Sequence, residues 1–214
     1  MPIETKFSRR SFLILLGSSG LIYGLFLSKK GKAKGVNWLF ETLPLKDDFI
    51  GKETAPVTVI TYASMTCSHC KSFHDTVMPM LKEKYINTGK VKLILRPFPF
   101  DGDHRGEAAF MLAKCTPNGN YYAMIDALFS TQSVWARKEN PVPEFLRLAK
   151  LAGMSEENFN DCLSDQNLLK KIIQSRQKAV ADFNVRSTPT IFVNNHKLRD
   201  FKLETVMKAI DDSL

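Results

Sequence analysis

The sequence has few cysteines and only ordinary amounts of glycine and proline. Each of these observations excludes a class of protein. Four cysteines among 214 residues are too few for a small domain held together mainly by disulfides. Eleven glycines and ten prolines exclude a collagen-like or low-complexity chain. The chain is 44% hydrophobic and 24% charged, so it can bury the core of one ordinary domain, with or without an insertion.

A general excess of positive charge is also missing from most of the chain. The formal net charge is +8, but residues 1–35 hold seven basic residues and one acidic residue. That leaves 23 of the 30 basic residues and 21 of the 22 acidic residues in positions 36–214, a net charge of +2. Because this larger part is close to neutral, we expect no nucleic-acid partner.

Residues 1–35 have the pattern of an export signal. The 18 residues from Ser11 to Ser28 carry no charge and lie between basic flanks, and an apolar stretch after a basic start is typical of such signals. We predict export to the periplasm, with the segment either cleaved or kept as a membrane anchor, since 18 residues is the lower limit of a span. Residues 8–13 resemble a twin-arginine signal, so that route and the general one both stay open.

The next part of the chain predicts a strand, a helix and a second strand. Residues 57–63 are β-branched and aromatic and follow Pro56, which predicts a strand. A helix is expected over residues 68–85, broken near Pro79, and residues 91–95 predict the second strand. This order is typical of a βαβ crossover between parallel strands.

The rest of the chain predicts a long helical block and then a strand-rich end. Residues 104–183 are expected to be helical, and in residues 190–193 strand character returns. A turn after residue 193 would join a short partner strand at 196–199, and residues 203–210 predict a closing amphipathic helix. We therefore predict an α/β fold with helices inserted between two parts of a small sheet. One buried helical face is expected to consist of Leu168, Leu169, Ile172, Ile173, Val180 and Phe183.

The candidate site is the motif Cys67-Ser68-His69-Cys70. Cys67 follows a predicted strand where a helix begins, and the free N–H groups and dipole of a helix N-terminus favour a thiolate there. His69 can add a hydrogen bond or a positive charge, and Cys70 is close enough to form a disulfide with Cys67. A C-x-x-C motif placed after a strand in a βαβ unit indicates thiol–disulfide chemistry.

Two other interpretations of the motif remain open. A structural disulfide is one, although the junction of a strand and a helix is a poor place to connect loops. A non-enzymatic module that holds zinc or copper through Cys67, Cys70 and His74 is the other, although no fourth ligand follows from the spacing. The redox interpretation requires no metal and no organic cofactor.

A second motif, Ser187-Thr188-Pro189-Thr190, stands directly before the strand predicted at residues 190–193. Here the sequence resembles the thioredoxin superfamily, in which a cis-proline before this strand packs against the active-site cysteines. Between Cys70 and Pro189 there are 118 residues, which leaves room for a helical insertion.

Within that superfamily the sequence resembles the DsbA family of exported thiol:disulfide interchange proteins. The resemblance covers roughly residues 45–214. It rests on Ala55-Pro56-Val57, Cys67-Ser68-His69-Cys70, Asp126-Ala127-Leu128-Phe129 with Gln132 and Trp135, and Thr188-Pro189.

The resemblance implies a thioredoxin-like domain, formed by residues 36–103 and 184–214, with residues 104–183 as an inserted helical domain. It also implies that Cys67 is the nucleophile and that Cys70 resolves the mixed disulfide. Thr188 and Pro189 would contact the substrate.

Two residues depart from the DsbA pattern. Ser68 stands where many members carry proline, and Thr61 stands where several keep a buried acid. We expect both Ser68 and Thr61 to affect the redox potential, and Thr61 also to affect any proton transfer at its position.

The remaining cysteines and histidines are expected to have no part in the chemistry. Cys115 and Cys162 are spare cysteines in an exported protein, so we predict that they form a structural disulfide. His74, His104 and His196 are isolated in the sequence, and we expect them to be exposed and without a role.

Taken with the resemblance, these residues predict a monomeric periplasmic oxidoreductase. It would donate the Cys67–Cys70 disulfide to cysteine-containing exported proteins through a mixed disulfide, and a membrane oxidase would reoxidise the dithiol. A disulfide isomerase or reductase of the same fold is the alternative. An isomerase usually has a dimerisation domain before the thioredoxin fold, and only about ten to twenty residues after the leader are available for one.

Overall fold

A computed structural model of the chain describes residues 43–214, which belong to one compact unit. The predicted leader, residues 1–35, lies outside the described residues. Within residues 43–214 no helix is both long enough and apolar enough to cross a membrane.

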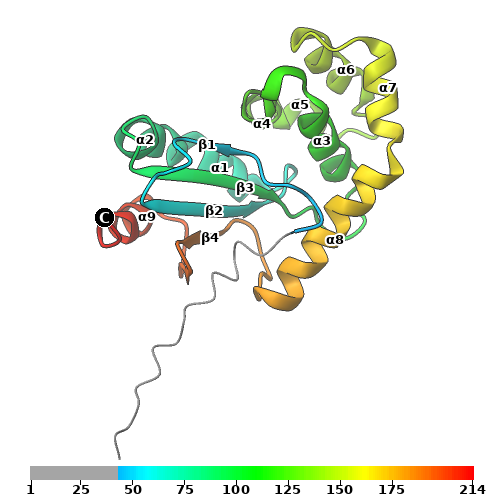
Figure 1. Cartoon of the computed structure of the whole chain (residues 1–214). Coiled ribbons are helices and arrows are strands. Elements are labelled where there is room, and N and C mark those ends of the chain that lie inside the picture. Colours follow the sequence, from blue (N-terminus) through cyan, green and yellow to red (C-terminus); the bar gives the residue numbers. More distant parts are fainter. Residues whose placement is uncertain (1–42) are drawn as a thin grey trace, which may run out of the picture. The chain divides into compact units, whose positions relative to one another are not determined.

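The centre of the described structure is a mixed five-stranded sheet with the order β1-β3-β2-β4-β5 (Figure 1). Strands β2 and β3 are parallel, and the other neighbouring pairs are antiparallel. The strands are β1 (Phe49–Ile50), β2 (Val57–Ala63), β3 (Val91–Pro97), β4 (Thr190–Val193) and β5 (His196–Lys197). The predicted parallel pair and the predicted hairpin at residues 190–199 are both confirmed.

The crossover between β2 and β3 is helical but divided into three pieces. These are α1 (Ser68–Thr76), α2 (Met78–Leu81) and the π-helix η2 (Lys82–Ile86). Pro79 lies in the first turn of α2, where its missing N–H costs no helical hydrogen bond. The break expected near Pro79 is therefore confirmed, and it falls at Val77.

The helical block lies between β3 and β4 in the sequence, as predicted. It consists of α3 (His104–Cys115), the 3-10 turn η3 (Pro117–Gly119), α4 (Tyr121–Ser130), α5 (Gln132–Trp135), α6 (Val142–Leu151), α7 (Glu156–Ser164) and α8 (Gln166–Asp182), and a last helix, α9 (Leu203–Asp211), follows the hairpin. Trp135 is fully buried and donates a hydrogen bond from Nε1 to the carbonyl oxygen of Leu128 at 3.0 Å.

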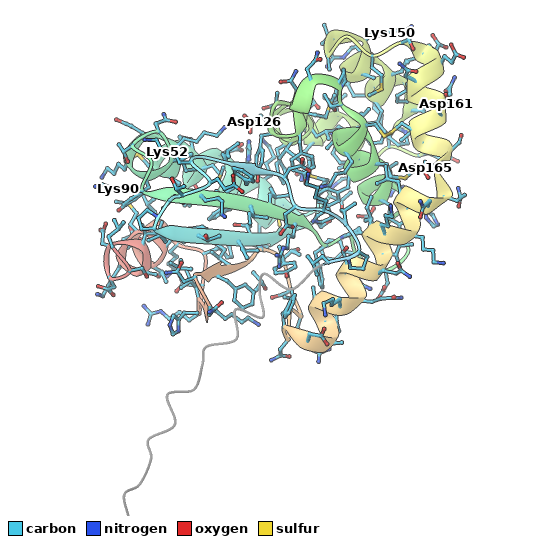
Figure 2. All side chains as sticks on the ribbon, viewed as in Figure 1. Lys52, Lys90, Asp126, Lys150, Asp161 and Asp165 are labelled. Carbon is cyan, nitrogen blue, oxygen red and sulfur yellow. A yellow bond between two sulfur atoms is a disulfide. The ribbon has the colours of Figure 1, made fainter. Side chains whose placement is uncertain are left out.

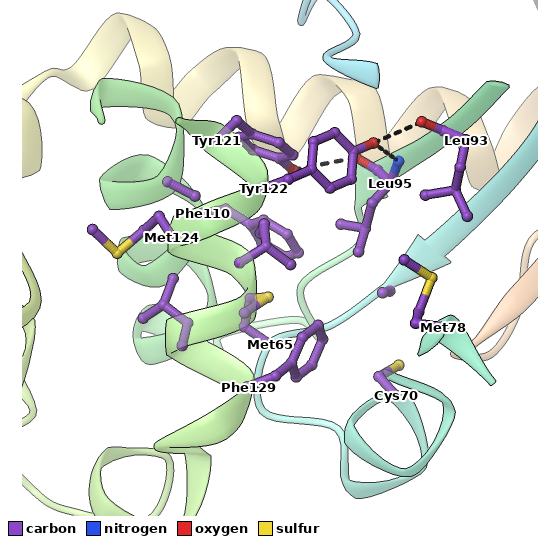
Figure 3. Close-up of a cluster of buried hydrophobic side chains, with 14 of the residues drawn as sticks. Met65, Cys70, Met78, Leu93, Leu95, Phe110, Tyr121, Tyr122, Met124 and Phe129 are labelled. Atoms are coloured by element: carbon purple, nitrogen blue, oxygen red, sulfur yellow. Dashed lines mark hydrogen bonds between the residues drawn. The ribbon is translucent and has the colours of Figure 1, made fainter. Parts of the chain in front are cut away.

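The sheet buries apolar side chains on both faces, in strict alternation along β2. Val59 and Ala63 belong to a large core that includes residues of α1, α9 and the helical block. Ile60 and Tyr62 point into a smaller core with Phe183, which follows α8. Because the large core is shared, the inserted helices pack directly on the sheet, as Figure 3 shows for Phe110 and Phe129.

Two tyrosines of α4 also connect the helical block to β3 by hydrogen bonds (Figure 3). The hydroxyl of Tyr122 accepts from the backbone N–H of Leu95 at 2.9 Å and lies 2.9 Å from the carbonyl oxygen of Leu93. The hydroxyl of Tyr121 donates to the carbonyl oxygen of Leu95 at 3.2 Å. These bonds use backbone groups of β3 that would otherwise be buried without partners.

The buried face of α8 differs from the prediction. Its fully buried residues are Ile172, Ser175 and Ala179, and Phe183 just beyond the helix is buried as expected. The apolar residues Leu168, Leu169, Ile173 and Val180 are only half-buried. Ser175 was missed because its burial depends on a distant partner: its hydroxyl accepts a hydrogen bond from the backbone N–H of Leu45 at 3.1 Å.

Candidate active site

Cys67 lies at the junction between the central strand and α1. Strand β2 ends at Ala63, and Cys67 is the N-cap residue of α1, with its sulfur 3.4 Å from the backbone N of Cys70. Only 7% of Cys67 and 2% of Cys70 is exposed. The structure therefore holds both thiols at the first turn of a helix, where the sequence predicts them.

The environment of Cys67 favours its thiolate. The pKa of Cys67 is lowered to about 5, mainly by a hydrogen bond from the thiol of Cys70. Burial opposes this shift, whereas hydrogen bonds from the backbone N–H groups of His69 and Cys70 reinforce it. At neutral pH the site therefore holds a stable, nearly buried thiolate.

The environment of Cys70 has the opposite effect. Burial raises the pKa of Cys70 well above the usual value, and the hydrogen bond to Cys67 and the charge of the Cys67 thiolate raise it further. The two sulfurs therefore have different protonation states in the reduced protein. At neutral pH Cys67 is a thiolate, and Cys70 keeps its proton.

His69 is exposed, and its ring centroid lies 5.9 Å from that of Phe201 in the loop before α9. Its contribution to the low pKa of Cys67 comes from its backbone N–H. A chemical role for the imidazole stays a prediction.

A loop more than a hundred residues away completes the site. The peptide bond between Thr188 and Pro189 is cis. The carbonyl oxygen of Thr188 lies 3.5 Å from Sγ of Cys67, and Pro189 lines a cavity together with Cys70. The structure thus brings together the two motifs, and contact of Thr188 and Pro189 with a substrate stays a prediction.

The helical block holds the backbone of the loop that carries Cys67. Nε2 of Gln132 donates hydrogen bonds to the carbonyl oxygens of Met65 and Cys67, at 2.8 and 3.1 Å. Gln132 is buried, so these bonds are shielded from water. In the sequence Gln132 stood out only as part of the family resemblance.

Asp103 makes a second connection to the same loop. Its carboxylate accepts a hydrogen bond from the hydroxyl of Thr66 and another from the backbone N–H of Gly106 at 3.0 Å. Asp103 thereby caps α3 and holds the residue next to Cys67. Asp103 was not among the predicted site residues, although an aspartate directly before a helix is a recognisable N-cap signal.

The prediction that His74 is exposed was wrong. Its side chain is only 12% exposed, with Nε2 3.1 Å from Oδ1 of Asp126 in α4. Its ring also packs on Phe129, with a centroid distance of 4.8 Å. The cause is the packing of α4 against α1, which no local pattern reveals. The other two histidines, His104 and His196, are exposed as expected.

Cys115 and Cys162 form a disulfide between the end of α3 and α7, with a Cα–Cα distance of 6.1 Å. Cys67 and Cys70 are free thiols. In residues 43–214, no group of three or more His, Cys, Asp or Glu side chains is arranged to hold a metal ion. Cys67, Cys70 and His74 therefore do not form the ligand set that the metal-binding alternative requires.

A cysteine with a lowered pKa at a helix N-terminus, a buried second cysteine one turn later and a cis-proline loop define a thioredoxin-type dithiol site. The family model described as Thioredoxin matches residues 45–212. The crystal structure of Wolbachia pipientis alpha-DsbA1 is 33% identical and covers 82% of this chain and 94% of its own, with a TM-score of 0.74. The chain therefore belongs to the thioredoxin family, and within it to the DsbA type of thiol-disulfide oxidoreductase.

Two further relatives carry names that describe the same chemistry. A Rickettsia bellii protein named as a protein-disulfide oxidoreductase is 28% identical over 170 residues, which are 78% of this chain and 64% of that protein. The chain thus spans less than two thirds of that relative's length. A Bacillus anthracis protein named as a disulfide bond formation protein D is 28% identical over 211 residues, 94% of this chain and 91% of that protein.

Proposed function

We propose that the protein donates its Cys67–Cys70 disulfide to exported proteins that contain cysteines. The observation that carries this proposal is the opposite shift of the two thiol pKa values, down to about 5 for Cys67 and upward for Cys70. A disulfide whose reduced form gains a stabilised thiolate is a strong acceptor of electrons.

The donation proceeds in two exchange steps. A substrate thiolate attacks Sγ of Cys67, the Cys67–Cys70 bond breaks, and its electron pair leaves on Cys70, which then takes up a proton. A second substrate thiolate attacks the substrate sulfur of the mixed disulfide, and Cys67 leaves as a thiolate. The substrate is oxidised by two electrons, and the Cys67–Cys70 pair is reduced by two.

The low pKa of Cys67 assists the second step in particular. A sulfur leaves faster from a mixed disulfide when the pKa of its thiol is low. The competing reaction is attack by Cys70 on the mixed disulfide, which would form the Cys67–Cys70 disulfide again. This attack requires that Cys70 first lose its proton, and its raised pKa opposes that loss. Oxidation and release of the substrate are therefore favoured.

The substrate would bind beside the cis-proline loop. The side chains next to Cys67 in α1, Ser68 and His69, are exposed, and Thr188 is half-buried. An unfolded polypeptide could approach the sulfur of Cys67 from this side. It would contact Thr188 and Pro189, the substrate contacts that the resemblance to the DsbA family implies.

We further propose a cellular compartment for the protein and a partner that reoxidises it. Donation of disulfides suits an oxidising compartment, so we propose that residues 1–35 export the protein to the periplasm. The reduced pair must pass two electrons to an acceptor after each turnover, and a membrane oxidase would serve as this partner. We propose that the protein acts as a monomer.

The assignment of roles is tested by trapping. In Cys70→Ser, the Cys67 thiolate can attack a disulfide of an oxidised substrate, and one substrate sulfur leaves as a thiolate. The mixed disulfide should then accumulate, because the Cys70 thiol that would displace the substrate from Cys67 is gone. Cys67→Ser should trap none, and Cys115→Ser with Cys162→Ser is the matched control for loss of cysteines elsewhere. Non-reducing gels with mass spectrometry would show the adducts, and equal trapping by the two active-site variants would refute the assignment.

The direction of transfer is tested by equilibration with glutathione. The Cys67–Cys70 pair should be more oxidising than the glutathione couple, because the reduced form holds the stabilised thiolate. A pair more reducing than glutathione would favour the reductase alternative.

A further inference from the structure

A small cavity lies behind Cys70, on the side of α1 that faces the sheet and α4. Its volume is about 10 Å³, close to the lower limit for one water molecule. Ten residues line it: Thr61, Ala63, Cys70, Phe73, His74, Met78, Leu93, Leu95, Phe129 and Pro189. Only Cys70 and His74 among them carry a side chain that can exchange a proton at ordinary pH.

Cys70 and His74 are neighbours on one face of α1. They are four residues apart in a regular helix, a spacing that places side chains one above the other. The adjacent hydroxyl of Thr61 is buried and makes no hydrogen bond to any described residue. This hydroxyl can form a hydrogen bond with a water molecule or with His74, but it is not itself an acid or base at ordinary pH.

His74 is held at its other end by a carboxylate. Nε2 of His74 lies 3.1 Å from Oδ1 of Asp126, whose second oxygen accepts a hydrogen bond from Lys82 at 2.8 Å. Burial opposes ionisation of Asp126, but the contacts with His74 and Lys82 outweigh it and lower the pKa of this carboxyl group. Asp126 is therefore an anion that faces the imidazole of His74. Figure 2 places Asp126 in the helical block.

Cys70, His74 and Asp126 differ in their exposure to solvent. The side chain of Asp126 is 39% exposed, whereas that of His74 is 12% exposed and Cys70 is 2% exposed. Exposure thus increases in order from Cys70 through His74 to Asp126. Oδ1 of Asp126 is buried, but the His74 side chain is itself 12% exposed, so a proton that leaves Cys70 can reach bulk water from the imidazole.

We propose that His74, oriented by Asp126, carries the proton of Cys70 to and from solvent during disulfide exchange. This inference rests on the proposed function, because only a protein that cycles between disulfide and dithiol needs the proton to move. His74 acts on Cys70 directly or through one water in the cavity and does not contact the substrate. It is therefore a positioning and proton-transfer residue.

The proton balance of each direction is simple. In donation, the Cys67–Cys70 bond breaks, Cys70 leaves as a thiolate, and protonated His74 gives it a proton. In reoxidation, neutral His74 takes the proton of Cys70 as its sulfur attacks the mixed disulfide on Cys67. The group bound to Cys67 then leaves as a thiolate, and His74 returns its proton to solvent.

The test isolates the step that uses Cys70. Reduced full-length protein is mixed with excess oxidised glutathione, samples are quenched in acid, and mass spectrometry counts the mixed and internal disulfides. Attack by Cys67 forms the mixed disulfide and needs no proton from Cys70. Attack by Cys70 then forms the internal disulfide and releases glutathione.

His74→Gln keeps a polar side chain of similar size but cannot carry the proton. We expect its second step to be at least about tenfold slower than wild type near neutral pH, as for loss of a general base. The deficit should shrink as pH rises, because hydroxide replaces the lost base. The first step should be unchanged. His196→Gln, an exposed histidine in β5, is the matched control.

Other titratable and charged groups near His74 also affect the pH dependence of the second step. They are Cys70 on α1, Asp126 on α4 and Lys82 on η2. Lys71 and Asp75, also on α1, form an ion pair with each other at 2.8 Å. Asp126→Asn keeps the shape and removes the charge, so its second step should be slowed less than that of His74→Gln. Asp126→Asn also provides the test if His74→Gln fails to fold.

The outcomes are distinct. A second step at the wild-type rate in both variants would overturn the inference, and so would equal slowing of both steps, which indicates a packing defect. A wild-type protein that forms no mixed disulfide would overturn the proposed function, and this inference with it.

Discussion

The side-chain amide of Gln132 donates a hydrogen bond of 3.1 Å to the carbonyl oxygen of Cys67. The same nitrogen donates to the carbonyl oxygen of Met65 at 2.8 Å. One residue of the inserted helices thus satisfies two buried backbone acceptors on either side of Thr66. The insertion therefore supports the loop that carries Cys67 as well as extending the fold.

Gln132→Leu should destabilise the protein by about 2–4 kcal/mol, because it leaves two buried carbonyl groups without partners. Denaturant unfolding of the reduced proteins would measure the change. Gln174→Leu is the matched control, since Gln174 is exposed on α8, and it should change stability by less than about 0.5 kcal/mol. A similar loss in both variants would contradict the supporting role of Gln132.

The reaction of Cys67 with an alkylating reagent should titrate with a midpoint near pH 5, as its lowered pKa requires. Cys70→Ala should raise this midpoint because it removes the main donor, yet leave it below that of an ordinary thiol because the backbone donors remain. His69→Ala keeps its backbone N–H and should raise the midpoint less. A larger effect of His69→Ala would assign the shift to the imidazole instead.

The reduced protein should be more stable than the oxidised protein at pH 7, and the sign of this difference should reverse as the pH falls toward 5. Cys67 has a folded pKa below its unfolded value, so its contribution is complete above the unfolded pKa and is lost as pH falls through the folded pKa. About two pH units separate pH 7 from the folded pKa, which corresponds to about 3 kcal/mol.

The opposing contribution is the loop closed by the Cys67–Cys70 disulfide. Chain entropy for such a short loop stabilises the oxidised form by about 2 kcal/mol. Denaturant melting of both redox forms at several pH values, with the Cys115–Cys162 disulfide intact, would measure the difference. A stability gap that is independent of pH would show that the Cys67 thiolate does not set the direction of exchange.

Removal of the Cys115–Cys162 disulfide by two serine substitutions should cost about 2–4 kcal/mol of stability, because the bond closes a long loop in the unfolded chain. The titration of Cys67 should not change, since neither residue contributes to its lowered pKa. Denaturant melting and the alkylation assay check these two expectations. A changed midpoint for Cys67 would mean that this disulfide affects the active site.

Several elements followed from the sequence because their causes are local. Strand β2 has the predicted bounds, since β-branched residues after Pro56 fit a pleated, buried strand. The break between α1 and α2 followed from Pro79. The placement of Cys67 at a helix N-terminus needed only the order of a strand, a C-x-x-C motif and a helix.

The amino-acid sequence by itself thus determined the type of fold and the place of the Cys67–Cys70 pair at a helix N-terminus. Only the tertiary structure decided what surrounds those thiols: Gln132 on the carbonyl of Cys67, Asp103 on Thr66, and Asp126 on His74. Each of these contacts joins segments more than thirty residues apart. Their geometry depends on how α3, α4 and α5 pack against α1 and the loop before it, and periodicity within one segment carries no information about such packing.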